Sequence, residues 1–331
     1  MVLLMSIKRT RAAQVSLAAI ALICATAVAP LPAAAQDGAR TPEPPVADTG
    51  EARPLEAPTD PRPPKDKFWL GEDWLEQGQL ETPVNHRVTR RALSYLNPTD
   101  NTEVPALLYR PAGDGRFPAV LFAHGRRGLD PLIERLAVRI AARGFAVLAP
   151  DVHQARLIAP MPVRHDPKTE GDIAAGIDAL LRLPDVSTTA ACLVSHTRGG
   201  YLTLKAAVAP GRQGRTIACY VSYYPHWQDP NLGEPDQVYR FAPEVERLAV
   251  PALILVGEYE QYQRRRSIEE AVRAMKARGS VVRLIIYPGV GRGFDFRPPE
   301  VRTFADDLAA KDAAHRTGTF LARHLAPFTK R

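Results

Sequence analysis

The sequence contains little cysteine and no cysteine or histidine pattern typical of metal ligands. Only three of its 331 residues are cysteine, and it has neither a CxxC pair nor an HExxH run. Structural zinc sites and dithiol redox sites normally show such spacings. We therefore expect no metal site and no cofactor.

Basic residues are not interleaved with aromatic ones anywhere in the chain. Aromatic residues make up 7% of it, charged residues 24%, and the formal net charge is +7. A nucleic-acid-binding domain usually concentrates basic charge on one face, often beside aromatics that stack on bases. The composition indicates a mildly basic protein with a small-molecule partner and no nucleic-acid partner. The short run QRRRS, residues 263–267, is expected to be a solvated helix face.

Residues 1–35 resemble a secretory signal peptide. A basic region is followed by an apolar stretch over residues 12–29 and by the small residues Ala33–Ala35, which suit cleavage. The apolar stretch is just long enough for a membrane anchor, but the cleavage site and the polar sequence after it favour removal. We expect an exported protein, periplasmic or secreted, with no stable membrane span once the signal is cleaved.

Residues 36–66 form a proline-rich segment that we predict to be a disordered linker. Eight prolines lie between Pro42 and Pro64, among acidic and small residues. Such a composition cannot bury an apolar core. The remaining residues, 67–331, have the length of one large α/β domain.

Two cysteines remain after signal cleavage, Cys192 and Cys219. Export permits a disulfide. Both residues, however, lie inside predicted strands, where we expect two buried free thiols.

Short, nearly continuous apolar runs alternate with helical patterns along the domain. Continuous runs are typical of strands buried on both faces of a parallel sheet. The predicted parallel strands are 118–125, 145–151, 191–196, 217–224, 252–258 and 281–288. The predicted helices are 129–144, 170–184, 198–209, 267–279 and 300–325. Residues 87–96 and 104–111 are expected to form an antiparallel pair at one edge. This order predicts a doubly wound, mostly parallel α/β sheet with helices on both faces.

Four segments at predicted strand ends resemble the dienelactone hydrolase family of the α/β-hydrolase superfamily. They are FAHGRRG (122–128), LVSHTRGG (193–200), LILVGEYE (253–260) and YPGVGRGFDFRP (287–298). They are similar, in order, to the family's oxyanion loop, nucleophile elbow, acid turn and base segment. The resemblance covers residues 87–326 and implies an α/β-hydrolase fold that acts on esters or lactones of small carboxylic acids.

All three triad positions depart from the pattern that the resemblance implies. Thr197 stands at the nucleophile position, Glu260 at the acid position and Arg292 at the base position. A β-branched residue is disfavoured at the positive φ of an elbow. A guanidinium stays charged and has no acceptor for a proton. The residues therefore do not support the ordinary Ser/Cys-His-Asp mechanism, and we expect weak or lost esterase activity.

Part of an oxyanion hole remains, from the N–H of Arg198 and an N–H of the turn at Gly125 and Arg126. Two alternatives to an impaired hydrolase stay open. In the first, His226 replaces the base and Asp229 orients it. In the second, the vestigial pocket binds a carboxylate or another small anion without turnover.

The binding alternative expects Glu260 and Arg292 to form an ion pair. Arg126, Arg127, Arg198 and Arg297 are predicted near the same mouth, with Arg127 and Arg297 as exposed surface side chains. Four histidines also fall near strand ends: His124, His153, His196 and His226. Four histidines at one rim could form a metal site, but the sequence lacks the ligand spacing typical of such sites. The side chain of His196 is expected to point away from the substrate.

Overall fold

The computed structural model describes residues 53–54, 86–233 and 236–330. The chain divides into two compact units, 1–45 and 46–331, and only the second contains described residues. The predicted signal peptide and residues 67–85 lie outside this description. Of the predicted linker, only Arg53 and Pro54 are described.

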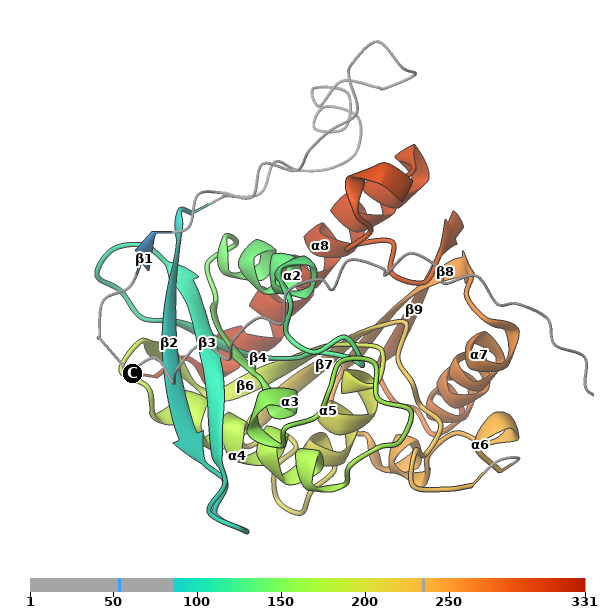
Figure 1. The fold of residues 1–331 in the computed structure, drawn as a ribbon, viewed down its shortest axis with the longest axis horizontal. Coiled ribbons are helices and arrows are strands. Elements are labelled where there is room, and N and C mark those ends of the chain that lie inside the picture. The colour runs from blue at the N-terminus through green and yellow to red at the C-terminus, as the bar shows by residue number, and fades with distance from the viewer. Residues whose placement is uncertain (1–52, 55–85, 234–235, 331) are drawn as a thin grey trace, which may run out of the picture. The chain divides into compact units, whose positions relative to one another are not determined.

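The described strands form one nine-stranded sheet in the order β1-β2-β3-β5-β4-β6-β7-β8-β9 (Figure 1). The six strands from β5 to β9 in this order run parallel, and β1, β2 and β3 are antiparallel to their neighbours. The strands are β1 (Arg53–Pro54), β2 (Val88–Leu96), β3 (Glu103–Pro111), β4 (Phe117–Ala123), β5 (Ala146–Pro150), β6 (Val186–His196), β7 (Ile217–Tyr223), β8 (Ala252–Tyr259) and β9 (Val282–Gly291).

Helices cover both faces of the sheet and bury a separate apolar core on each (Figure 1). One face packs against α2 (Pro131–Ala141) and α8 (Phe304–Leu325). The other carries α4 (Lys168–Arg182), α5 (Gly199–Ala207) and α7 (Tyr262–Ala277). Short helical turns complete the chain: α3 (Val152–Ala155), α6 (Asp236–Tyr239), η1 (Pro243–Arg247), η2 (Pro299–Val301) and η3 (Ala326–Phe328).

The predicted doubly wound sheet is confirmed, including its antiparallel edge pair. Both ends of α2 follow local rules, because Asp130 caps its N-terminus with bonds to the N–H groups of Leu132 and Ile133 and Gly144 follows it at φ +96°. The largest difference concerns α7, which begins at Tyr262 and not near residue 267. Its first turn is therefore built from the arginine-rich run.

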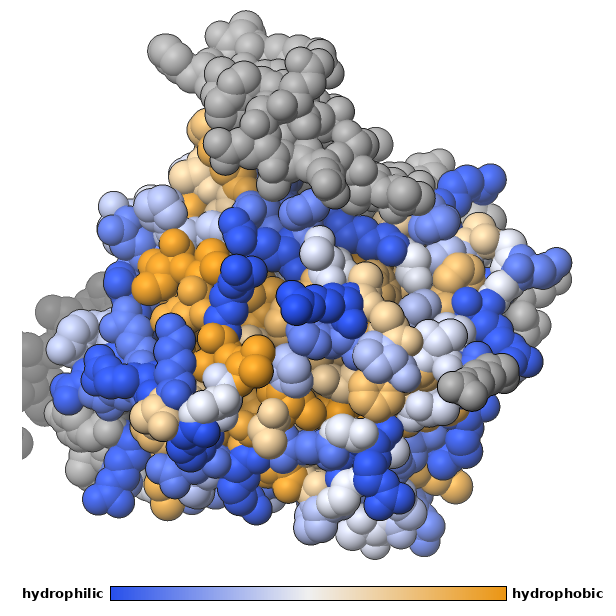
Figure 2. All heavy atoms as spheres, turned by 180° about the vertical axis from the view of Figure 1, so that it is seen from behind, coloured by the Kyte–Doolittle hydropathy of each residue, from blue (hydrophilic) through white to orange (hydrophobic). Residues whose placement is uncertain are grey.

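The surface opposite the view of Figure 1 mixes charged and apolar side chains, with apolar patches between hydrophilic ones (Figure 2). Among the described helices, none combines the length and the apolar character needed to cross a membrane.

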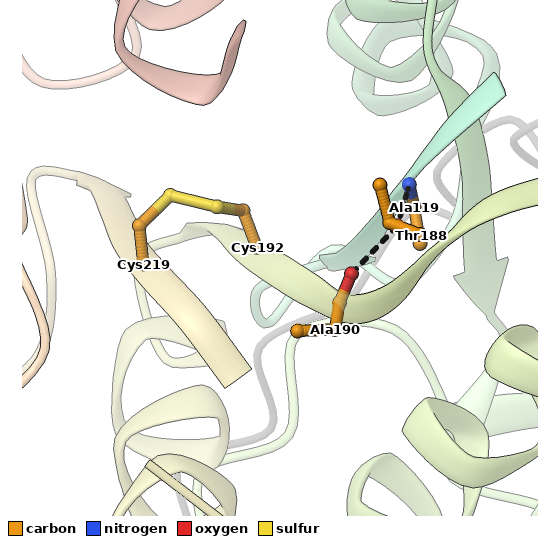
Figure 3. The surroundings of a disulfide bond; sticks show 5 residues. All are labelled: Ala119, Thr188, Ala190, Cys192 and Cys219. Carbon is orange, nitrogen blue, oxygen red and sulfur yellow. Dashed lines mark hydrogen bonds between the residues drawn. A yellow bond between two sulfur atoms is a disulfide. The ribbon is translucent and has the colours of Figure 1, made fainter. Parts of the chain in front are cut away.

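The expectation of free thiols is wrong, because Cys192 and Cys219 form a disulfide (Figure 3). They lie opposite each other on the neighbouring strands β6 and β7, with their Cα atoms 4.6 Å apart. Both residues are fully buried. The two cysteines lie in different strands, and the register of β6 against β7 places them side by side.

Candidate active site

The turn after β6 has the geometry of a nucleophile elbow. Thr197 links the strand to α5 and has φ +49°, a conformation that is strained for a β-branched residue. Its backbone is held on both sides, because its N–H donates to Tyr223 O at 3.2 Å and its carbonyl accepts from His226 N at 2.8 Å. The sharp turn is therefore present, although its central residue is poorly suited to it.

The hydroxyl of Thr197 lies against the oxyanion loop. A Cβ placed on Gly125 would lie 1.8 Å from Thr197 Oγ1, so only glycine fits opposite this side chain. Oγ1 is buried and has no hydrogen-bond partner among the described residues. In the same part of the structure, no residue accepts a bond from the backbone N–H of Arg126 or Arg198. The oxyanion donors are thus available, whereas the hydroxyl is hydrogen-bonded to no described base.

The acid and base positions are joined in an ion pair, as expected. Nη1 of Arg292 donates to Oε1 of Glu260 at 2.8 Å, and the Glu260 side chain is fully buried. The same oxygen accepts the N–H of Gln261 just before α7. Nη2 of Arg292 donates to the carbonyl of Tyr224 at 3.1 Å, and the guanidinium lies 5.4 Å from the centre of the Tyr224 ring. Glu260 therefore holds a cation and a helix N-terminus instead of orienting a histidine.

A cavity of about 290 Å³ opens beside this pair. It brings together most of the positions that we predicted for the site. Its polar lining comes from Gly125, Arg126, Arg127, His196, Thr197, His226, Gln261, Arg264, Arg292 and Gly293, and its apolar lining from Ile133, Met161 and Phe296. The expected pocket therefore exists at the carboxyl ends of the parallel strands, where sites of such sheets collect.

His226 reaches the cavity, but Asp229 does not orient it. Oδ1 of Asp229 accepts bonds from the Tyr201 hydroxyl and the N–H of Asn231. Nε2 of His226 is buried and has no partner among the described residues. Burial, and then the positive charge of Arg292 and other arginines, lowers the pKa of His226 well below its usual value. The ring is therefore neutral near pH 7, and the predicted dyad with Asp229 is wrong.

His196 forms a buried hydrogen-bonded pair with Asp295, which the sequence did not reveal. Nε2 of His196 lies 2.8 Å from Oδ2 of Asp295, and both side chains are essentially buried. The Tyr224 hydroxyl donates to the other carboxylate oxygen. This network joins the elbow to the segment that carries Arg292. The GFDF sequence placed Asp295 close to the base position, but nothing in it identified His196 as its partner.

Arg126 and Arg198 bind the backbone of an adjacent loop. Nε of Arg126 donates to the carbonyl of Pro162 at 2.8 Å, and Nη1 of Arg198 donates to the carbonyl of Arg164 at 3.1 Å. Each guanidinium thus already donates some of its N–H groups to backbone carbonyl oxygens. The two side chains fasten residues 161–164 beside the cavity and add positive charge to it.

The two arginines expected on the surface behave differently. Arg127 is exposed, as expected, and it pairs with Asp130. Arg297 is partly buried, lies 3.2 Å from Oδ1 of Asp306 and donates to the carbonyl of Arg292 at 3.4 Å. The expectation of an exposed Arg297 is therefore wrong, since this side chain supports the turn at the base position.

Arg264 is the cavity arginine that the sequence reasoning missed. Because α7 begins early, Arg264 lies in its first turn and lines the cavity, whereas Arg265 and Arg266 pair with glutamates on the helix surface. No hydrogen bond or ion pair joins the Arg264 side chain to another described residue. Burial and the positive charge of Arg292 lower the pKa of Arg264 to about 10, although Glu260 opposes this.

The two remaining histidines of the predicted rim lie at a separate, water-sized cavity of about 20 Å³. The rings of His124 and His153 are in contact there, with centres 4.7 Å apart. Across the described part of the chain, no group of three or more His, Cys, Asp or Glu side chains is placed to hold a metal ion.

Comparison with known proteins identifies the family of this chain. The model of the family described as "Dienelactone hydrolase family" matches residues 104–325. The "Probable 2-oxo-3-(5-oxofuran-2-ylidene)propanoate lactonase" of Bradyrhizobium sp. is 24% identical over 231 residues, covering 66% of this chain and 89% of that protein. A shorter match of 60 residues is 43% identical to the "Putative hydrolase fragment YghX" of Escherichia coli K12 and covers 18% of this chain and 51% of that protein.

Solved structures show the same fold. The crystal structure of carboxyl esterase 2 from Tuber melanosporum superimposes with a TM-score of 0.55 at 20% identity, covering 72% of this chain and 86% of that chain. A likeness at this identity concerns the fold alone, and it confirms the expected α/β-hydrolase architecture.

Proposed function

The chain belongs to the dienelactone hydrolase family, and we propose that this member binds a small organic anion in the hydrolase pocket and has lost ordinary ester hydrolysis. The observation that carries the proposal is the 2.8 Å ion pair between Arg292 and Glu260. A guanidinium at the base position has no lone pair for a proton, and its partner carboxylate is already engaged. The Thr197 hydroxyl is therefore not activated.

The electrostatics of the cavity support binding of an anion. The Glu260 carboxylate beside the cavity is neutralised by Arg292. The charge of Arg264 remains unbalanced, and Arg126 and Arg198 add to the same positive field. The lowered pKa values of Arg264 and His226 have this field among their causes. An anion entering the cavity would form charge-assisted hydrogen bonds and relieve the repulsion.

Catalysis with His226 as a relocated base is the second candidate. It has one observation in its favour: a neutral His226 lines the same cavity as Thr197. Against it, no described carboxylate orients the ring, and Thr197 Oγ1 and His226 Nε2 are not hydrogen-bonded. A weak residual hydrolase would use this residue.

We also propose that the mature protein acts outside the cytoplasm, in the periplasm or as a secreted protein. The signal-like sequence of residues 1–35 supports this. So does the disulfide between Cys192 and Cys219, because such bonds persist in oxidising compartments.

Hydrolysis of p-nitrophenyl acetate and butyrate by the purified protein tests the loss of catalysis. We expect wild type near the uncatalysed rate, and a rise of about 10²-fold or more in Thr197→Ser/Arg292→His, because a general base typically contributes about 10²–10⁴-fold. Robust wild-type turnover that disappears in Thr197→Ala would contradict the proposal. Loss of turnover in His226→Gln as well would identify the relocated base.

Isothermal titration with acetate, phosphate and sulfate tests the binding half. We expect Arg292→Ala and Arg264→Gln to weaken binding. Arg266→Gln should leave it unchanged, because that exposed side chain pairs with Glu270 on the outer face of α7. Equal behaviour of wild type and both cavity variants towards all three anions would sink the binding proposal.

A further inference from the structure

Met161 is held at the cavity in a left-handed backbone conformation, which residues with a side chain rarely adopt. It lines the cavity, the residue is 55% exposed, and its φ is +61°. Its N–H donates to the carbonyl of Arg126 at 2.7 Å, and its own carbonyl accepts from Nη2 of the same arginine at 3.1 Å. Non-glycine residues keep such strain where the surroundings enforce it, often at functional sites. The oxyanion loop thus fixes the position of Met161.

Met161 is one part of an apolar wall. Ile133 from α2 and Phe296, from the segment after Gly293, also line the cavity. Met161 is unbranched and polarisable, so it adapts to ligands of different shape. The cationic lining comes from other elements, with Arg264 on α7 and Arg292 after β9. The cavity therefore offers a charged surface and an apolar surface to the same ligand.

The same loop exposes two further apolar residues that are not part of the cavity lining. Leu157 and Val163 flank Met161 in sequence and are 94% and 86% exposed. Arg198 holds this loop, through bonds to the carbonyls of Val163 and Arg164.

We propose that the ligand is an organic monoanion with an apolar chain or ring, whose anionic group binds Arg264 beside Arg292 and whose apolar part packs against Met161 and Phe296. This inference rests on the proposed function and narrows it. Inorganic phosphate and sulfate satisfy only the charged surface. Neutral or cationic molecules of the same length satisfy only the apolar one.

A ladder of linear carboxylates from acetate to octanoate tests this by isothermal titration below micelle-forming concentrations. We expect Kd to fall by about fourfold for each added methylene until the cavity is filled, the equivalent of about 0.8 kcal/mol per buried methylene. Alcohols and alkylammonium ions of matched length should bind at least tenfold more weakly. Met161→Gln should flatten the ladder and leave acetate binding intact, and Arg264→Gln should weaken every carboxylate.

Arg266→Gln serves as the matched control on α7, and Met161→Ala as a second variant if Met161→Gln unfolds. Equal Kd values for acetate and octanoate would overturn this inference while the proposed anion site stood. Equal binding of octanol and octanoate would overturn the need for an anionic group, in this inference and in the proposed function. Absence of any carboxylate binding together with rapid ester turnover would remove the proposed function itself.

Discussion

Oε1 of Glu260 lies 2.8 Å from Nη1 of Arg292 and 2.9 Å from the backbone N of Gln261. One carboxylate oxygen thus ties the turn after β9 to the start of α7. The family pattern has an acid that orients a histidine across this gap. In this chain the same two positions join the turn that carries Arg292 to the start of α7, which carries Arg264. The two segments are therefore held together without a histidine at the base position.

We expect Glu260→Gln to lower the free energy of unfolding by about 3 kcal/mol, because it leaves a partly buried guanidinium without its counter-charge. Arg292→Met should be destabilising too, and the double substitution should cost less than the sum of the two. Urea denaturation of the four proteins measures the coupling. Additive costs would show that the two side chains do not interact, and Glu270→Gln on the α7 surface should change little.

The disulfide gives a prediction about both stability and compartment. Cys192 and Cys219 are separated by 27 positions in sequence, and closing a loop of this size contributes about 3.5 kcal/mol. Cys192→Ala/Cys219→Ala should therefore unfold at clearly lower urea concentration. Maleimide labelling of the denatured exported protein should find no free thiol before reduction and two after it. Two free thiols before reduction would contradict the bond and remove its support for the export proposal.

The order of strands and helices could be predicted because local signals agree with the fold. Continuous apolar runs mark the strands that are buried on both faces, and Asp130 and Gly144 mark the ends of a helix. The elbow at Thr197 also followed from its sequence, since the strand-turn-helix pattern is local. The disulfide could not be predicted in the same way, because it depends on the register of β6 against β7.

The chemistry of the cavity was only partly visible in the sequence for a similar reason. The Glu260–Arg292 pair followed from the family resemblance, which aligns two distant segments. Arg264 was missed because its role depends on where α7 begins, and its neighbours Arg265 and Arg266 do lie on the helix surface. The bond between His196 and Asp295 joins residues 99 apart, and no spacing rule connects them.

The pH dependence of stability should reveal His153. Burial, and then the charge of His124, lowers the pKa of His153 to about 4, whereas a histidine in the unfolded chain titrates near pH 6.5. Between these values the unfolded chain binds the proton and the folded protein does not. The contribution of a neutral His153 to stability is therefore present above about pH 6.5 and is lost as the pH falls towards 4.

Thermal unfolding at pH 7.5, 6, 5 and 4 measures this effect. We expect His153→Gln to show a smaller drop in Tm over the range than wild type. Substitution of the exposed His86 by Gln should keep the wild-type profile. Identical profiles for His153→Gln and wild type would place the acid sensitivity on other groups.

The contact between Gly125 and Thr197 provides a direct test of the elbow geometry. A Cβ at position 125 would lie 1.8 Å from Thr197 Oγ1 and 3.0 Å from its Cβ, so Gly125→Ala should cost about 2 kcal/mol or more through overpacking. In Thr197→Gly both clashing atoms are absent, and glycine also relieves the strain at φ +49°. The same Gly125→Ala change should therefore cost less in the Thr197→Gly background, as measured by urea denaturation. An equal cost in both backgrounds would mean that the Thr197 side chain does not face the oxyanion loop.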